Sequence, residues 1–278
     1  MNDTLKKHWP EYLIEASGLA FFMMSACAFG ALLEHPASPA HQAIPDDLAR
    51  RMLMGVAMGL TSIGIVYSPW GRRSGAHLNP SMTLTFLRLG KIEWRDAVFY
   101  VCAQFAGGIT GVLVARGAIE EFVSHPKVNY VATLPGERGL AVAFMAEAVI
   151  SFILMFVVLN VSNNMKLARF TGLLAGALVA TYISVEAPLS GMSLNPARTF
   201  GSAFSAQAWM GLWIYFTAPP LGMLLASELY IRLKGKREVY CAKLYHDNRA
   251  RCIFRCRYSE MSARIQPHNA RLANQQIS

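Results

Sequence analysis

Long apolar stretches separated by short polar segments form the basic pattern of this chain. At 1.5 Å per residue, six of these stretches are long enough to cross about 30 Å of hydrocarbon as a helix. They are Glu11–Leu33, Leu48–Ser68, Trp94–Arg116, Leu140–Asn160, Phe170–Ala187 and Ala208–Leu233. Two further segments, Asn79–Leu87 and Asn195–Phe204, hold roughly ten residues each and reach only halfway. The pattern predicts an all-α membrane protein with six transmembrane helices and two re-entrant half-helices.

Each predicted half-helix begins in a copy of the same short phrase. The first copy is Ser-Gly-Ala-His-Leu-Asn-Pro-Ser-Met-Thr at 74–83, and the second is Ser-Gly-Met-Ser-Leu-Asn-Pro-Ala-Arg-Thr at 190–199. Asn is a favoured N-cap, and Pro suits the first helical position because its missing N–H would be unpaired there. Asn79 and Asn195 are therefore expected to open the half-helices. Extended backbone before them is tolerated at membrane depth only beside protein or a watery cavity.

The duplication extends beyond this phrase. Matching residues in the two halves are Glu15 with Glu147, the pair Gly55 and Gly59 with Gly172 and Gly176, and the trio Ala103, Gly107 and Gly111 with Ala218, Gly222 and Ala226. Small residues four apart lie on one helix face and let membrane helices approach closely. We therefore predict two related three-span units, residues 11–116 and 140–233. Because three spans is an odd number, the units are inverted relative to each other.

Composition and charge support the membrane assignment and suggest an orientation. The chain has 278 residues, 54% of them hydrophobic and 15% charged, and a mean hydropathy of +0.31. The net charge of +9 lies mostly in loops and the C-terminal tail, so nucleic-acid binding is not expected. Up to Arg237, 13 Lys and Arg residues lie on the side of the termini, against five in the opposite loops. The positive-inside rule then places both termini in the cytoplasm of a multi-pass cell-membrane protein.

The predicted spans and the charge distribution divide the chain into three regions. They are a cytoplasmic N-terminus at residues 1–10, a channel domain at residues 11–234, and a basic cytoplasmic tail at residues 235–278. The tail is expected to be largely disordered or to lie on anionic lipid.

The two Asn-Pro phrases are expected to meet at the centre of a pore. Opposed half-helices place about half a positive charge each at one spot, and this potential repels cations. Each Asn amide can cap its own helix and still donate into the lumen. Narrowness, donors and positive helix ends are the ingredients of a pore that excludes protons. The alternative is a pair of helix caps without a lumen, which would be costly in lipid unless water reached them.

Three charged residues at membrane depth need a reason to be there. Arg198, three residues after Asn195, is expected to be a cation-repelling donor at the outer constriction; a structural ion pair, with Glu186 as a possible partner, is the alternative. For Glu15 and Glu147 a proton relay is conceivable. Their symmetric placement favours a structural role, in which each accepts hydrogen bonds from uncapped N–H groups of a re-entrant loop.

Two further groups of residues carry weaker signals. His77, which has Ser193 as its counterpart, is read as a hydrogen-bonded loop residue or as a pH-sensitive lining of the vestibule. The tail residues Cys241, Cys252 and Cys256, with His246 nearby, could form a zinc cluster. They include no C-x2-C pair, so solvated free thiols are favoured, and no metal site and no cofactor is predicted. Cys27 and Cys102 fall in apolar spans, as packing cysteines do.

From Glu11 to Lys234 the chain resembles the aquaporin or major intrinsic protein family. The resemblance rests on the two Asn-Pro phrases, the symmetric glutamates, Ala-Gln-Phe-Ala-Gly at 103–107 and Pro-Leu-Gly at 220–222. The resemblance implies a homotetramer with one pore per protomer and passive flow of water or small neutral solutes. It makes Asn79-Pro80-Ser81 and Asn195-Pro196-Ala197 the paired pore motifs. It also implies a selectivity filter, which would consist of Met58 or Gly59, Ile183, Met192 and Arg198.

The substrate signals conflict. The filter lacks the Phe and His typical of water-selective members, since Ile183 stands at the His position; this favours glycerol, urea, ammonia or undissociated metalloid acids. Thr199 and Ala203, however, depart from the pattern of glycerol facilitators, and the pair Tyr215-Phe216 resembles water channels. A proton-coupled transporter using the membrane-embedded glutamates is the alternative function. The residues offer no catalytic constellation, so an enzyme is not expected.

Overall fold

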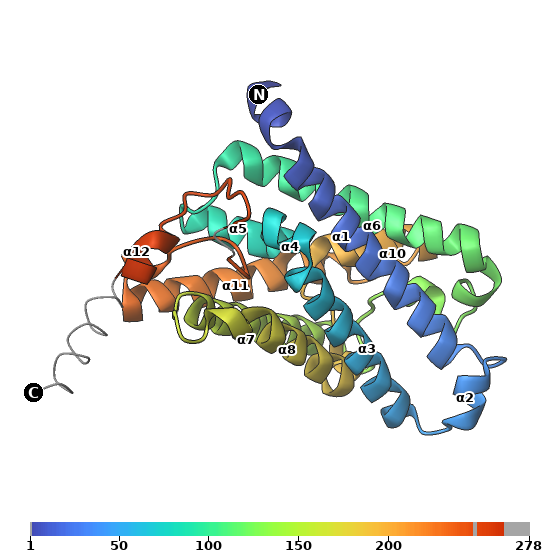
Figure 1. Ribbon diagram of the computed structural model, residues 1–278. Coiled ribbons are helices and arrows are strands. Elements are labelled where there is room, and N and C mark those ends of the chain that lie inside the picture. Colours follow the sequence, from blue (N-terminus) through green and yellow to red (C-terminus); the bar gives the residue numbers. More distant parts are fainter. Residues whose placement is uncertain (1, 247–248, 264–278) are drawn as a thin grey trace, which may run out of the picture.

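The described part of the chain is built from helices packed into one bundle. The computed structural model describes residues 2–246 and 249–263, and no strand occurs among them. Its long helices are α1 (Asn2–Glu34), α3 (Asp47–Tyr67), α6 (Trp94–Val123), α7 (Leu140–Ser162), α8 (Thr171–Val185) and α11 (Leu212–Lys234). Two shorter helices, α5 (Pro80–Arg88) and α10 (Pro196–Ala206), begin directly after the two asparagines (Figure 1). The fold is all-α, as the hydrophobic pattern predicts.

Five of the long helices are long and apolar enough to cross a membrane: α1, α3, α6, α7 and α8 with the 3-10 turn η2 (Ala168–Phe170) before it. The predicted sixth span corresponds to α11, a helix of 23 residues that contains Pro219, Pro220 and Glu228. These residues lower its average apolarity, so composition alone does not mark it as a span. Its packing against other helices of the bundle is what gives α11 a position equivalent to that of the other long helices.

The packing pairs repeat between the two halves of the chain. In the first half α1 packs along α6 and also contacts α3; in the second half α7 packs along α11 and also contacts α8. The half-helices are exchanged, because α5 packs on α11 and α10 packs on α6. Each half therefore contributes its short helix to the other half. The helix contacts therefore repeat between two sets of three long helices, while the inversion of one set relative to the other stays a prediction.

Close contacts between helices use the small residues that the repeat shares. A Cβ atom added to Gly59 would lie 2.7 Å from the carbonyl oxygen of Gly176 across the α3–α8 contact. A Cβ atom on Gly107 would lie 2.1 Å from the oxygen of Ala16, and one on Gly222 would lie 2.2 Å from the oxygen of Ala148. Backbones this close leave no room for a side chain. The glycines thus set the spacing between α3 and α8, α1 and α6, and α7 and α11.

Short elements complete the connections between the long helices. They are α2 (Pro39–Ala43), α4 (Pro69–Ser74), η1 (Asn129–Val131), α9 (Ala187–Ser190), η3 (Lys236–Glu238) and α12 (Tyr258–Ala263). Two predicted boundaries shift. Helix α1 begins at Asn2 rather than near residue 11 and contains Pro10, and α6 continues past Arg116 to Val123. In both places a helix extends beyond its apolar stretch through residues that carry charge.

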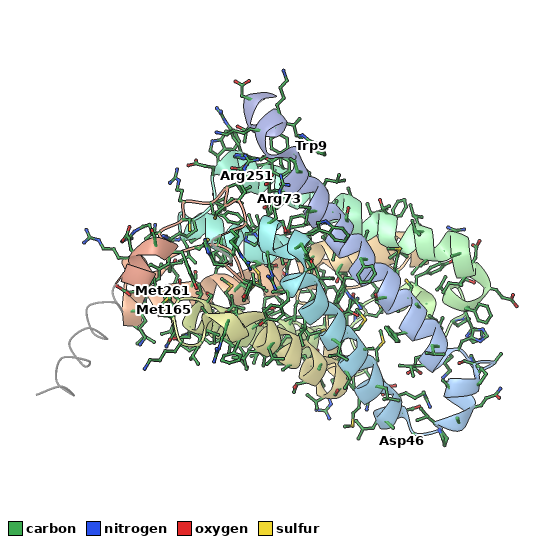
Figure 2. All side chains as sticks on the ribbon, viewed as in Figure 1. Trp9, Asp46, Arg73, Met165, Arg251 and Met261 are labelled. Atoms are coloured by element: carbon green, nitrogen blue, oxygen red, sulfur yellow. The ribbon has the colours of Figure 1, made fainter. Side chains whose placement is uncertain are left out.

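The tail differs from its predicted description. From Val239 to Arg257 the described residues have little regular secondary structure, yet many are buried against the bundle. In Figure 1 this red segment lies at the end of the bundle where α11 finishes, beside α5. Figure 2 labels Arg251 of the tail and Arg73 at this end and Asp46 at the opposite end. Arg73 and Arg251 both approach the buried carboxylate of Glu11, at 3.0 and 3.9 Å. The packed part of the tail is therefore not free in solvent; residues 264–278 lie outside the described part.

Candidate pore and its lining

The two loops before the half-helices have the same unusual backbone. Each follows a short helix that ends in a left-handed glycine, with φ of +94° at Gly75 and +78° at Gly191. The next left-handed residues are Ala76 and Leu78 in the first loop, and Met192 and Leu194 in the second. Non-glycine residues adopt this region at a cost that the surrounding contacts must offset. The repeat in sequence is therefore also a repeat in conformation.

Two buried glutamates hold these loops in place. The carboxylate of Glu15 accepts hydrogen bonds from the backbone N–H groups of His77 and Leu78, at 3.1 and 2.7 Å. The carboxylate of Glu147 accepts the equivalent bonds from Ser193 and Leu194, at 2.6 and 2.8 Å. Neither residue is exposed. Because each carboxylate accepts N–H groups that have no helical partner, the geometry is that of a structural acid.

Neighbouring side chains complete each loop in matching ways. Ser74 and Ser190 donate to the two glutamates, both at 2.8 Å. The hydroxyls of Tyr100 and Tyr215 donate to the carbonyl oxygens of these serines, at 2.7 and 2.6 Å. No sequence motif marks Tyr100, and Tyr215 is marked only as part of the pair that resembles water channels. The two tyrosines are as far apart in the sequence as the repeated small residues of α6 and α11. They therefore occupy matching positions of the repeat, which could have identified them.

Asn79 and Asn195 cap the half-helices and join the two loops. The side-chain oxygen of each accepts the N–H two residues later, from Ser81 at 2.9 Å and from Ala197 at 3.0 Å. The amide of Asn79 donates to the carbonyl oxygen of Leu194 at 2.8 Å, and the amide of Asn195 donates to that of Leu78 at 2.7 Å. An amide carries two N–H donors, so each Asn retains one beyond this bond. The loops are thus tied together at the point where the helix ends meet.

A cavity of about 310 Å³ runs past this junction. Both asparagines line it, together with residues of both loops. Towards one end its lining includes Glu34 and Arg51, and towards the end that carries the tail it includes Val66 and Leu244. The cavity therefore extends along the bundle on both sides of the meeting half-helices. Its wall is mostly apolar, with the polar groups concentrated on the two loops.

Four of the proposed filter residues line the cavity: Met58, Ile183, Met192 and Arg198. Of the two candidates on α3, Met58 is the lining residue, because Gly59 lies in the α3–α8 contact. The guanidinium of Arg198 donates to the hydroxyl of Thr133, which in turn lies 3.0 Å from the hydroxyl of Thr199. Thr133, in the loop after η1, was missed from the sequence because nothing in its neighbourhood repeats.

Glu186 and His77 each have hydrogen-bond partners within the protein. The carboxylate of Glu186 accepts a hydrogen bond from the hydroxyl of Ser190 at 2.5 Å, so it shares that serine with Glu147. The ring of His77 is buried between Thr83, 3.1 Å from Nδ1, and the carbonyl oxygen of Ala242, 2.8 Å from Nε2. His77 is therefore a hydrogen-bonded loop residue, and one of its partners belongs to the tail.

The tail cysteines are not solvated thiols. Cys241 is 4% exposed, and Cys252 and Cys256 are partly buried. Together with His246 they form a group whose sulfur and nitrogen atoms all lie within 4.8 Å of one another. The prediction of free thiols in solvent is wrong because the irregular chain between the cysteines folds back on itself against the bundle. Nearby, burial lowers the pKa of the Lys243 ammonium, which donates to the carbonyl oxygen of Arg72 at 2.7 Å.

Comparison with known proteins agrees with this architecture. The family model "Major intrinsic protein" matches residues 4–230, most of the chain. The chain belongs to this family. The family resemblance stated from the sequence is therefore confirmed, and members of this family are channels rather than enzymes.

Several major intrinsic protein relatives are similar in sequence. "Glycerol uptake facilitator protein-like 6" of Lactiplantibacillus plantarum is 39% identical over 184 residues, which cover 63% of this chain and 82% of that protein. "Probable aquaporin NIP-type" of Nicotiana alata is 34% identical over 177 residues, 63% of each chain. "Aquaporin NIP6-1" of Arabidopsis thaliana is 33% identical over 193 residues, 69% of this chain and 61% of the relative. The chain thus spans less than two thirds of the length of the two plant proteins.

A solved structure is similar in fold. The aquaglyceroporin from Plasmodium falciparum has a TM-score of 0.64 at 21% sequence identity, covering 80% of this chain and 95% of the other. At this identity the likeness supports the fold of the bundle.

Proposed function

We propose that this major intrinsic protein is a passive channel for water and small uncharged solutes. The observation that carries the proposal is the cavity that passes both half-helix ends and the guanidinium of Arg198. If only helix N-caps and apolar side chains lined this cavity, it would be a packing defect. This one has donors, carbonyl groups and a cation along a path through the bundle, as a selective pore requires.

The polar groups would act by replacing water contacts of the solute. A hydroxyl oxygen or a water oxygen passing Asn79 and Asn195 accepts from the amide N–H that each retains. The two helix N-termini and Arg198 make this point positive, so a cation or hydronium ion is repelled while a neutral molecule is not. Passage then needs no protein group to change its protonation. This is why we favour a channel over a coupled mechanism.

The composition of the wall suggests which solutes are accepted. Met58, Ile183 and Met192 offer methylene and methyl groups to the cavity that Arg198 also lines. Molecules with both polar and apolar faces, such as glycerol, urea, ammonia or undissociated metalloid acids, suit this lining better than water alone. One relative is named a glycerol uptake facilitator and others are named aquaporins. We propose that small polar-apolar solutes pass together with water.

The setting of the channel is part of the proposal. The excess of Lys and Arg near the termini favours a multi-pass protein of the cell membrane with both termini in the cytoplasm, and α11 as its sixth span. The many large apolar side chains exposed on the bundle surface, among them Phe21, Val56 and Leu221, suit lipid or another protomer. Membership of the family supports a homotetramer with one pore in each protomer.

The direct test is stopped-flow light scattering on proteoliposomes that contain the purified protein. Water, glycerol, urea and a neutral metalloid acid are compared side by side, with empty liposomes as the control. We expect water and at least one of the solutes to cross faster than in empty liposomes, with non-saturating flux down the solute's own gradient. Permeability equal to that of empty liposomes for all four would refute the proposal.

A proton-coupled transporter is the alternative function. It would need a carboxylate free to gain and lose a proton during transport. Glu15 and Glu147 instead accept loop N–H groups, and Glu186 shares Ser190 with Glu147. If flux saturated steeply and collapsed when the proton gradient was dissipated, the coupled mechanism would replace the channel.

A further inference from the structure

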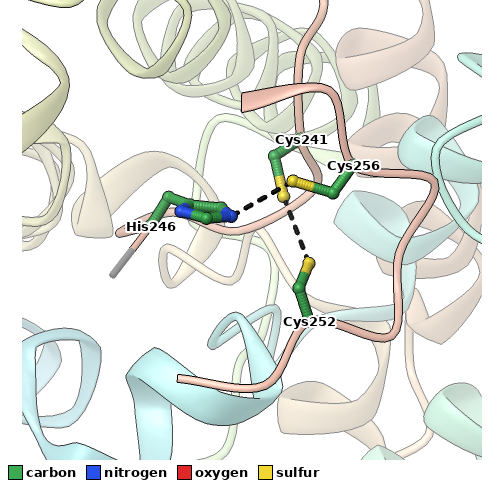
Figure 3. A group of neighbouring side chains, drawn as sticks. All are labelled: Cys241, His246, Cys252 and Cys256. Atoms are coloured by element: carbon green, nitrogen blue, oxygen red, sulfur yellow. Dashed lines mark hydrogen bonds between the residues drawn. The ribbon is translucent and has the colours of Figure 1, made fainter. Parts of the chain in front are cut away.

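The group formed by Cys241, His246, Cys252 and Cys256 lies in the tail, away from the pore motifs. Figure 3 shows the four side chains converging on one another. The Sγ atoms of Cys241 and Cys252 are 3.6 Å apart, and Nε2 of His246 is 3.1 Å from Sγ of Cys256. All four ligand atoms fall within 4.8 Å of one another. Four soft or borderline ligands have therefore been gathered by a segment of only sixteen residues.

These distances suit a tetrahedral metal ion. With Zn–S bonds of about 2.3 Å and Zn–N bonds of about 2.0 Å, the corners of a tetrahedron lie roughly 3.4 to 3.8 Å apart. The Cys241–Cys252 sulfur distance lies in this range, and the distance from His246 Nε2 to Cys256 Sγ is a few tenths of an ångström shorter. A disulfide needs sulfur atoms at about 2.05 Å, and all three cysteines are free. Three thiolates and one imidazole at tetrahedral corners are the ligand set of closed, structural zinc sites.

The segment that holds the group has little secondary structure of its own. Between Val239 and Arg257 the described residues form neither helix nor strand. Its internal backbone bonds are few; one of them joins the N–H of Arg257 to the carbonyl oxygen of Tyr240 at 2.8 Å. A small segment without a core of its own is the kind of structure that a bound metal stabilises, because binding free energy becomes folding free energy.

The same segment contacts the rim of the cavity from several sides. Leu244 lines the cavity, and its N–H donates to the carbonyl oxygen of Gly75 at 3.1 Å. The ring of Phe254 stacks on His77, with centroids 5.3 Å apart. The N–H of Arg255 bonds to the carbonyl oxygen of Lys91 at 2.9 Å. The segment therefore spans from the first re-entrant loop to the α5–α6 connection.

Two more contacts join the segment to the end of α7 and to α1. The backbone N–H of Tyr240 donates to the side-chain oxygen of Asn163 after α7 at 2.7 Å, and the guanidinium of Arg251 donates to the carbonyl oxygen of Lys7 on α1 at 3.1 Å. The tail thus reaches α1, the first loop, the α5–α6 connection and the end of α7. These are the elements around one end of the cavity.

We propose that Cys241, His246, Cys252 and Cys256 bind one Zn²⁺ ion, and that this ion fixes residues 239–257 as a cap over the tail end of the pore. The zinc site stands on the ligand geometry alone; the effect on transport rests on the proposed channel function. Binding releases the protons of the three thiols and leaves the oxidation state of metal and protein unchanged. Loss of zinc frees the cap and opens that end of the cavity.

Metal binding is tested on the full-length protein purified without added chelator. Zinc content is measured by mass spectrometry, and Co²⁺ is substituted as a spectroscopic probe. We expect about one zinc ion per protomer. Cobalt should give thiolate charge-transfer bands and the visible bands of a tetrahedral site. The variant Cys252→Ser/Cys256→Ser should lose both signals. The control Cys102→Ala, whose thiol lies on α6 outside the group, should keep them. Equal zinc content in the double variant and the control would overturn the site.

The cap is tested by trypsin, which can cut after Arg251, Arg255 and Arg257. Removal of zinc with a high-affinity chelator should speed cleavage of the tail several-fold in Cys102→Ala and have no further effect in Cys252→Ser/Cys256→Ser. Equal cleavage with and without zinc in Cys102→Ala would show that the ion does not fix the cap. This readout needs no transport, so it separates failure of this proposal from failure of the channel function.

The effect on the pore is measured in the same proteoliposomes with a membrane-permeant zinc chelator. We expect solute permeability to rise several-fold on chelation in Cys102→Ala, and to be high from the start in Cys252→Ser/Cys256→Ser. Unchanged permeability in Cys102→Ala, with zinc shown to be lost, would overturn the role in gating. Flux absent from every variant would refute the channel function and leave the zinc and trypsin results to decide the site and the cap.

Discussion

The two re-entrant loops share a backbone but face different surroundings. In each, a left-handed glycine, a glutamate below the loop and a capping asparagine occupy matching positions. The side chains towards the ends of the cavity differ. The first loop carries His77, which the tail covers through Ala242. The second carries Ser193, which bonds to Thr199 of α10 and to the carbonyl oxygen of Asn195. The repeated residues hold the shape, and the unmatched ones give the two ends of the pore different properties.

A second difference lies one turn into the half-helices. Arg198 of α10 corresponds to Met82 of α5, and both line the cavity. The second half thus supplies the only strong donor and cation among these matched positions, while the first half supplies an apolar side chain. The matching backbones of the two loops therefore do not give matching electrostatic potentials at the two ends of the cavity. Four predictions test this comparison.

The largest effect is expected from removing a loop glutamate. Glu147→Ala leaves the N–H groups of Ser193 and Leu194 buried without acceptors, and Glu15→Ala does the same to His77 and Leu78. Each orphaned donor costs about 1–3 kcal/mol, so each variant should lose about 2–6 kcal/mol of stability. The measurement is thermal unfolding in detergent, compared with the conservative Glu→Gln change. A melting temperature unchanged in either Ala variant would contradict the structural role.

The next largest effect concerns the unmatched Arg198. Arg198→Met copies the residue of the first half and removes the positive charge from the second. Repulsion between unit charges at 4 Å is about 1 kcal/mol in water and about 4 kcal/mol near a protein surface, so proton or cation leak should rise at least about fivefold. A pH-sensitive dye inside proteoliposomes reports the leak. Ion exclusion that survived the change would assign it to the helix ends alone.

The third prediction concerns the apolar wall beside the second loop. Met58→Phe with Ile183→His should narrow the cavity and reduce glycerol flux more than water flux, because bulk is added where both residues line the path. Gly59→Ala is the contrast: its Cβ would lie 2.7 Å from the oxygen of Gly176, so folded yield should fall instead. Both are read by stopped-flow and by size-exclusion chromatography. Equal loss of both fluxes in a well-folded double variant would move the constriction elsewhere.

The smallest effect is expected at Ser81, which makes the first motif differ from the second. Its hydroxyl is buried and, among the described residues, makes no hydrogen bond. Ser81→Ala would make the motif match Asn195-Pro196-Ala197. Removing an unsatisfied hydroxyl should leave stability unchanged or raise it by up to about 1 kcal/mol, with flux unaltered. A clear fall in water permeability would show that Ser81 contributes to the path.

Several predictions from the sequence agree with the structure for local reasons. Asn is favoured at the N-cap and Pro at the first helical position, so α5 and α10 begin where expected. Small residues four apart mark the faces of close packing, and Gly59 with Gly176 lie in such a contact. The limits of α1 and α6 were missed because a helix can continue through charged residues once it has left the apolar layer, and no change of period marks its end.

The sequence by itself determined that the fold is all-α and that a short helix starts after each Asn-Pro pair, and it predicts two inverted units, since these follow from segment length, hydrophobic period and the repeated residues. The tertiary structure decided which side chains face the cavity, because the choice between Met58 and Gly59 depends on how α3 turns against α8. It also decided the character of the tail. Its cysteines are spaced like no familiar metal motif, and only the folding of an irregular segment against the bundle brings their sulfur atoms together.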